Sequence, residues 1–322
     1  MKLQTNIPLS PQENQIDYKS KILLLGSCFV ENIGDKLEYY KFRNLQNPFG
    51  ILFQPTAIEN LISRAIKEVP FTEDDIFYYN EQWHCFLVHS SLSSSDKEKF
   101  LNSLNKKRSQ LLSYIKSATH IVFTFGTSWV YRNIASNSLV ANCHKIPQIK
   151  FTKELLSVDE VAVSIRNTIS LIKDINPKVN FITTISPVRH LKDGFVENNR
   201  SKAHLISGLQ SVVDEASKKE RSLSQVEVFP SYEIMMDELR DYRFYKEDMI
   251  HPNKTAISLI WNAFSEVWIA DETRQLQKEI GIIQTGLSHK PFHSESKAHQ
   301  KFLKDLGFKI NSLQNKISHL KF

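Results

Sequence analysis

The first 270 residues alternate between two hydrophobic patterns. Short continuous apolar runs are typical of strands buried on both faces of a sheet; they cover residues 21–25, 120–125, 179–185 and 226–229. Apolar residues at every third or fourth position indicate amphipathic helices; they cover residues 55–67, 96–117, 158–173, 203–218, 231–240 and 255–270. An aromatic-rich hairpin is predicted over residues 77–79 and 83–89, with His84 and His89 in structural roles. The alternation predicts an α/β fold in which a mainly parallel sheet lies between two helical layers.

The hydrophobic pattern changes after residue 270, so we expect an α/β domain over residues 1–270 and a helical extension over residues 271–322. The extension begins with a predicted helix over residues 273–284. Apolar residues then recur at spacings of three and four: Leu303, Leu306, Ile310, Leu313, Ile317 and Leu320. This seam fits a helix packed back on the domain, and it also fits a coiled-coil contact in a homodimer. The pattern leaves both interpretations open.

Composition narrows the class of protein. The chain has 322 residues, of which 41% are hydrophobic and 24% charged, which is an ordinary balance for a globular protein with a large core. No apolar stretch approaches the ~20 residues needed to cross a membrane, and the first residues lack the apolar core of a signal peptide. Three cysteines argue against a disulfide framework and favour a reducing cytoplasm. The net charge of +6 is dispersed among acidic residues, so nucleic acid is not an expected partner.

Two segments carry groups suited to catalysis. Ser27 follows the first apolar run directly after Gly26, which predicts a tight turn with the serine at the carboxyl end of a strand. Asp248 and His251 stand three residues apart near the other end of the domain. A serine hydroxyl needs a base to become a nucleophile, and a carboxylate can orient a histidine for that task. The simpler alternatives are a helix N-cap for Ser27 and a helix entry for Asp248 and the residues after it.

Other polar groups have alternative chemical interpretations. Cys28 could be a thiol nucleophile, although a cysteine beside a core strand is more often a buried apolar residue. Cys143 and His144 are adjacent, which does not match the usual spacing of zinc ligands, so we interpret residues 142–145 as a loop that lines a pocket. A mostly basic segment begins at Arg189. It is either a solvated loop or a lip that binds a polar or anionic acyl ester.

The segment Gly26-Ser27-Cys28-Phe29-Val30 closely resembles the signature of the GSCFA domain family, which has alanine at the last position. That family is placed among the SGNH (GDSL-like) hydrolases. The resemblance covers residues 20 to 270, and the further stretches that carry it are Asn47 to Gly50, Phe125 to Trp129, Asn142 to Lys145, Ser186 to His190 and Asp248 to Pro252. It implies a three-layer, flavodoxin-like α/β/α fold and a serine esterase that needs no cofactor or metal.

The resemblance also implies an oxyanion hole. Ser27 corresponds to the nucleophile and to one N–H donor, and Gly50 corresponds to a second N–H donor. The third block of the superfamily usually contains an asparagine whose amide is a further donor. Here that block is Gly126-Thr127-Ser128-Trp129, so the asparagine is absent. Ser128 or Asn142 would have to supply the missing hydrogen bond, whose loss costs about 3 kcal/mol of transition-state stabilisation.

Asp248 and His251 match the final block of the superfamily unaltered. The sequence therefore predicts a serine esterase acting on a small-molecule or glycan O-acyl ester, with His144 and Arg189 at the substrate site. An acyltransferase would use the same triad, and that alternative stays open. So does a non-catalytic module that binds carbohydrate or an anionic polymer on the same fold, because a fold alone does not guarantee chemistry.

Overall fold

The computed structural model describes residues 5–218, 226–317 and 319–322. Its centre is a parallel sheet of five strands in the order β10-β9-β5-β1-β2. These strands are β1 (Lys21–Gly26), β2 (Arg43–Gln46), β5 (His120–Phe125), β9 (Asn180–Ile185) and β10 (Val226–Val228). The chain goes outward from β1 to β2 and then returns to β5 on the other side of β1. This is the flavodoxin-like order, in which ligands bind beyond the carboxyl ends of the two strands where the direction reverses, here β1 and β5.

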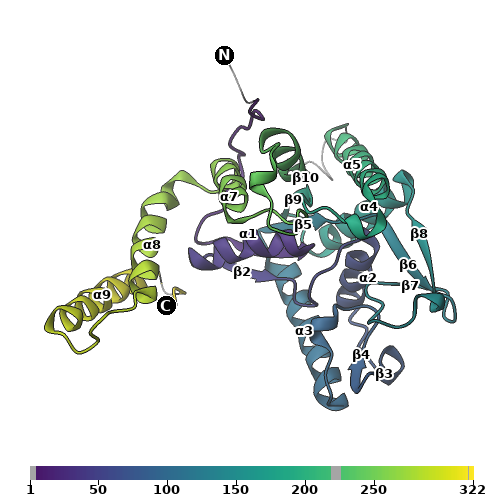
Figure 1. The fold of residues 1–322 in the computed structure, drawn as a ribbon, viewed down its shortest axis with the longest axis horizontal. Helices are drawn as coiled ribbons and strands as arrows, with labels where there is room; N and C mark the ends of the chain where they lie inside the picture. The colour runs from purple at the N-terminus through teal and green to yellow at the C-terminus, as the bar shows by residue number, and fades with distance from the viewer. Residues whose placement is uncertain (1–4, 219–225, 318) are drawn as a thin grey trace.

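Helices cover both faces of the sheet, so the predicted three-layer α/β/α architecture is confirmed (Figure 1). One face packs against α2 (Pro55–Ile66), α3 (Lys97–Ser117), α4 (Val158–Ile175) and α5 (Phe195–Lys218). The other face packs against α1 (Cys28–Tyr39) and α7 (Lys254–Trp268).

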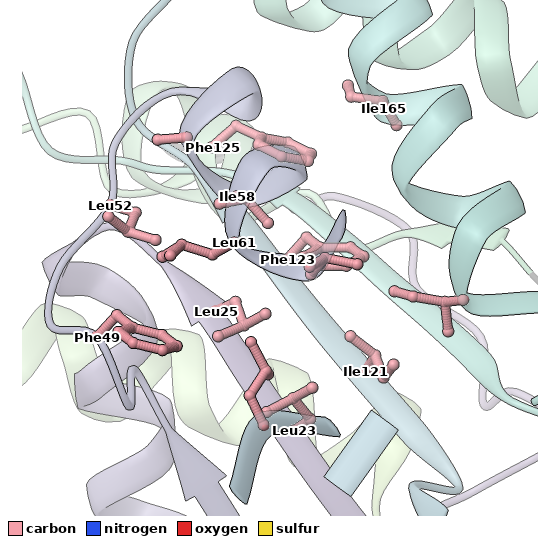
Figure 2. Packing of buried hydrophobic residues seen from close by; sticks show 14 of the residues in the cluster. Leu23, Leu25, Phe49, Leu52, Ile58, Leu61, Ile121, Phe123, Phe125 and Ile165 are labelled. Atoms are coloured by element: carbon pink, nitrogen blue, oxygen red, sulfur yellow. The ribbon is translucent and has the colours of Figure 1, made fainter. Parts of the chain in front are cut away.

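Side chains alternate between two apolar cores along each central strand. Leu23 and Leu25 of β1 join Ile121 and Phe123 of β5 in the core under α2 to α5, as Figure 2 shows. The intervening residues, such as Leu24, join the core under α1 and α7. Both faces of these strands are buried, which explains why their sequences are continuous apolar runs.

Several elements differ from the sequence-based expectation. Helix α5 begins at Phe195 rather than at residue 203, so half of the predicted basic loop is helical. The second hairpin strand ends at residue 84, because β3 (Phe77–Tyr79) pairs only with β4 (Gln82–His84). The sequence patterns missed β2 and a small antiparallel sheet in the order β7-β6-β8, formed by β6 (Trp129–Asn133), β7 (Ser138–Val140) and β8 (Phe151–Leu155). These short strands are partly exposed and lack a continuous apolar run.

The remaining helical segments are short. The predicted helix over residues 231–240 is α6 (Ser231–Glu233) followed by one π-helical turn over Ile234–Glu238. Turns of 3₁₀ helix lie in the connections, at Glu73–Asp75, Ser90–Leu92, Gln148–Lys150, Leu191–Asp193, Tyr242–Phe244 and Asp271–Thr273. In the described part of the chain, no helix is both long enough and apolar enough to span a bilayer.

The C-terminal extension consists of α8 (Arg274–Ser288) and α9 (Lys297–Lys316), which extend to one side of the sheet (Figure 1). The apolar seam of α9 packs back: Leu306 and Leu313 are buried in the same core as residues of α8, and Leu306 lies directly against Gly286. The amide of Gln284 also donates to the carbonyl of Tyr39 at the end of α1 (3.0 Å). Phe308 of α9 remains exposed, and a homodimer contact through the C-terminal helix stays a prediction.

Candidate active site

Ser27 lies in the strand-to-helix turn between β1 and α1, at the carboxyl edge of the sheet. Gly26 makes the turn possible, because its φ is +143° and a Cβ there would collide with the carbonyl of Thr124. The N–H of Ser27 donates to that carbonyl (2.9 Å), and its Oγ accepts from the N–H of Phe29 (3.3 Å). Ser27 is therefore the N-cap of α1, and it is fully buried. Its capping role does not exclude a catalytic one, since the turn lies at the edge of the sheet where ligands bind.

Asp248 and His251 form a hydrogen-bonded pair on the loop before α7. Oδ2 of Asp248 accepts from Nδ1 of His251 (2.8 Å), and Oδ1 accepts from the N–H groups of Ile250 and His251 (2.8 and 2.9 Å). Met249 reaches the left-handed region (φ +55°) to close this loop. The backbone hydrogen bond from His251, followed by that from Ile250, lowers the pKa of Asp248 to about 2. An ionised carboxylate on Nδ1 leaves Nε2 of His251 as the basic nitrogen.

The two segments approach one another at the carboxyl ends of β1, β5 and β9. The loop after β9 contacts the histidine loop, since the N–H of Arg189 donates to the carbonyl of Ile250 (3.3 Å). The next residue, His190, lies beside Gly126 and Ser27. In the described part of the chain, no hydrogen bond joins Ser27 to His251. The fold thus brings the predicted groups to one edge of the sheet, while the serine–histidine contact itself is not made.

The predicted oxyanion donors already have partners. Besides the N–H of Ser27, the N–H of Gly50 donates to the carbonyl of Asn47 (2.8 Å) in a turn where Gly50 has a φ of +74°. The N–H of Gly126 donates to the carbonyl of Phe53 (2.7 Å). To bind an oxyanion, each of these N–H groups would have to leave its present carbonyl acceptor or divide its hydrogen bond between that carbonyl and the oxyanion. Their role as oxyanion donors therefore stays a prediction.

The polar side chains proposed as the missing donor are directed elsewhere. Oγ of Ser128 donates to the carbonyl of Ser201 (3.1 Å), and Ser128 is fully buried. Oδ1 of Asn142 accepts from the N–H of His144 (2.8 Å). His144 in turn donates from Nε2 to the carbonyl of Cys85 (2.8 Å), and burial lowers its pKa to about 4. Their hydrogen bonds tie the residues 142–145 loop to the hairpin segment, and none of them reaches Ser27.

Arg189 lines a hollow of about 240 Å³ next to the histidine loop. Its guanidinium lies over the rings of Tyr245 (4.2 Å) and Tyr242 (5.7 Å), and Tyr245 pairs with Pro252 directly after His251. Arg240 and Asp241 line the same hollow, and the carboxylate of Asp241 is paired with Arg243 (3.2 Å). Neither Arg189 nor Arg240 forms a salt bridge in the described residues. The hollow is therefore suited to a polar or anionic group held beside the histidine.

The fold brings two further residues to the candidate site, and the sequence patterns had placed both of them in a loop. Lys202 is 2% exposed, and its Nζ donates to the carbonyls of Gly126 and Ser186, the first residues after β5 and β9 (2.7 and 2.6 Å). Burial lowers its pKa to about 7. His190 lies in the same region, and burial, followed by the nearby charge of Lys202, lowers its pKa to about 3. The inward spacing of Asn198, Lys202 and Leu205 could have revealed the helix.

Cys28 lies beside Ser27 at the first position of α1. Burial is the main cause that raises the pKa of its thiol, so the thiol is protonated near neutral pH. The site therefore gives no sign of an activated thiolate at Cys28.

Comparison with known proteins places the chain in a family. A model of the GSCFA family matches residues 21–264. The chain belongs to the GSCFA family. A second model, described as the GSCFA domain protein, C-terminal domain, matches residues 280–322. No curated protein matches the sequence.

One solved structure that matches is a carbohydrate esterase family 3 protein from Talaromyces cellulolyticus. It shares 9% sequence identity, with 81% of this chain and 99% of that chain covered, at a TM-score of 0.37.

Proposed function

We propose that this GSCFA-family protein is a serine-dependent ester hydrolase with Ser27 as nucleophile, His251 as base and Asp248 as the group that orients the base. One observation supports this most directly. Asp248 holds Nδ1 of His251 at 2.8 Å on the same sheet edge that Ser27 occupies, at the strand reversal between β1 and β5.

The mechanism uses a covalent intermediate. The loop that carries His251 brings Nε2 of the imidazole to Oγ of Ser27. Nε2 then removes the hydroxyl proton as Oγ attacks the ester carbonyl. The tetrahedral intermediate collapses, the carbon–oxygen bond of the leaving group breaks, and His251 returns the proton to the departing alkoxide. Water then attacks the acyl-enzyme by the same proton transfers in reverse. A sugar hydroxyl in place of water would make the protein an acyltransferase.

The hollow beside His251 suggests the substrate class. Arg189 and Arg240 lie there with two tyrosine rings, an arrangement that holds a carboxylate, phosphate or sulfate next to an apolar body. We propose an ester whose acyl or alcohol part carries an anionic group, including an acidic glycan. We also propose a cytoplasmic location, because three cysteines in 322 residues are too few for a disulfide framework.

A fluorophosphonate probe followed by peptide mass spectrometry tests the proposal. Labelling of Ser27 in the intact protein, lost in Ser27→Ala and retained in Cys28→Ala, is the expected result. Labelling at another residue, or equal labelling of Ser27→Ala, contradicts the assignment of the nucleophile. Adding a sugar alcohol to an ester assay and measuring acylated sugar then separates transfer from hydrolysis.

A second candidate function is a non-catalytic module that binds an anionic polymer. The observation in its favour is that Ser27 is fully buried, caps α1 and makes no hydrogen bond to His251 within the described residues. An absence of fluorophosphonate labelling, together with salt-sensitive binding of a sulfated polysaccharide that Arg189→Ala weakens, would favour this module over the hydrolase.

A further inference from the structure

His190 forms part of the wall around Ser27. A Cβ built on Gly126 would lie 3.1 Å from Nε2 of His190, 3.2 Å from the ring of Phe53 and 3.3 Å from Cβ of Ser27. Nε2 and the serine side chain therefore border the same small space over Gly126. Glycine at position 126 keeps that space open, because any larger residue would occupy it.

Nε2 of His190 is a buried polar atom without a hydrogen-bond partner in the described structure. Buried polar groups in proteins are nearly always paired, so an unpaired one beside Ser27 needs an explanation. The neighbouring backbone donors at Ser27, Gly50 and Gly126 are all engaged with carbonyl groups. His190 thus offers a nitrogen that is next to the nucleophile and is not yet used.

The ring and the backbone of His190 are both held in place. The ring packs edge to face against Phe53, with the ring centroids 5.2 Å apart and the planes at 80°. The backbone N–H of His190 donates to Oδ1 of Asn198 (2.8 Å). Lys202 holds the loops after β5 and β9 together, since its Nζ donates to the carbonyls of Gly126 and Ser186. A donor that is fixed before the reaction stabilises a developing charge without a cost for reorganisation.

The charge state suits a donor rather than a base. Burial, followed by the charges of Lys202 and His251, lowers the pKa of His190 to about 3. The ring is neutral near neutral pH and carries one proton. Negative charge developing beside Nε2 favours the tautomer with the proton on Nε2.

We propose that His190 is a catalytic residue that donates a hydrogen bond from Nε2 to the oxyanion formed when Ser27 attacks an ester. This inference rests on the proposed hydrolase function. It gives the site a side-chain donor in place of Ser128 and Asn142, whose hydrogen bonds are directed away from the serine.

The test compares three variants of the intact protein on p-nitrophenyl acetate: His190→Ala, His190→Leu and His190→Gln. His190→Ala and His190→Leu are expected to lower kcat by about 10²–10³-fold while KM stays within about threefold, as for loss of an oxyanion donor. His190→Gln is expected to recover at least about tenfold of that loss, because its amide can donate from a similar position. A glutamine amide cannot replace a general base, so this recovery separates the two roles.

Thermal unfolding of the same variants separates catalysis from structure. His190→Leu removes an unpaired buried nitrogen, so its Tm is expected to equal or exceed that of the wild type. Wild-type kcat in His190→Leu overturns the proposal. Equal loss of kcat in His190→Gln and His190→Leu, or a loss that parallels a fall in Tm, also overturns it.

Ser27→Ala in the same assay keeps the two proposals apart. Unchanged turnover in Ser27→Ala means that the hydrolase assignment has failed. An inactive Ser27→Ala beside a fully active His190→Leu means that only the role of His190 has failed. The rate of fluorophosphonate labelling at Ser27 gives a second readout if p-nitrophenyl acetate is a poor substrate.

Discussion

The serine side and the histidine side of the candidate site are built in opposite ways. Ser27 is fully buried, and its turn is fixed by hydrogen bonds to β5 and α1. Asp248 and His251 lie on a loop with side chains that are 43% and 39% exposed, and their hydrogen bonds close within four residues. The sheet and helix specify the first arrangement, whereas a short local motif specifies the second.

This difference predicts how each side responds to change. Substitutions on the serine side are expected to affect both folding and the proposed chemistry, because the hydroxyl that caps α1 is also the proposed nucleophile. Substitutions on the histidine side affect chemistry with little effect on the global fold, because exposed loop residues contribute little to the core. The proposed reaction requires Nε2 of His251 to reach Oγ of Ser27, and loops close over many active sites when substrate binds.

The largest expected effect comes from removing either end of the proton transfer. Ser27→Ala and His251→Ala are each expected to lower turnover by about 10⁴-fold or more. Ser27→Ala should also lower the free energy of unfolding by about 1 kcal/mol through loss of the N-cap, whereas His251→Ala should leave it nearly unchanged. Ester hydrolysis and urea unfolding measure the two effects. Cys28→Ala is the matched control and should keep full turnover; a loss there equal to that of Ser27→Ala would move the nucleophile to the thiol.

Asp248→Asn tests whether the local motif orients the base. It removes the carboxylate from Nδ1 of His251, and we expect turnover to fall by about 10³-fold or more. The lowered pKa of Asp248, about 2, also has a consequence for stability. The ionised form stabilises the folded state above pH of about 4, and this contribution is lost as the pH falls from about 4 to about 2. Unfolding measured at pH 5 and pH 3 should show a smaller acid dependence in Asp248→Asn, and an identical dependence would argue against the pair.

Lys202→Met tests the buried side without touching Ser27. It leaves the carbonyls of Gly126 and Ser186 without their donor, which we expect to cost about 1–3 kcal/mol of unfolding free energy. The wild-type lysine has its pKa lowered to about 7, while the unfolded chain keeps the proton up to a pH of about 10. Folding of the wild type should therefore become more favourable as the pH rises from about 7 to about 10. Denaturation at pH 7 and pH 9 should show that rise reduced in Lys202→Met; an equal rise in both proteins would contradict the burial effect.

The smallest expected effect concerns the hollow beside the exposed side. Arg189→Ala is expected to raise KM about tenfold for an ester that carries a carboxylate, the equivalent of about 1.4 kcal/mol. A neutral ester of similar size should be hydrolysed with nearly the same KM by both proteins. Equal changes for the two esters would mean that Arg189 has a packing role rather than a role in recognising charge.

Local sequence determined much of the fold. Continuous apolar runs gave β1 and β5, and helical spacing gave α2 and α4, because burial on two faces or on one stripe leaves a direct trace in the sequence. The motif Gly26-Ser27 and the pair Asp248 and His251 were visible for the same reason, since their turn and hydrogen bonds are local.

What only the tertiary structure decided is which groups meet. The strand order sets Ser27 beside Gly126, and the loop after β9 brings His190 to the same space; these residues are up to 163 positions apart in the sequence. The sequence alone indicates that Lys202 is a solvated charge in a loop. Lys202 is buried because α5 begins at Phe195, which places this residue on the inward side of the helix. A periodic pattern records which side of an element is buried. It does not record which distant element covers that side, because that choice follows from packing and strand order in three dimensions.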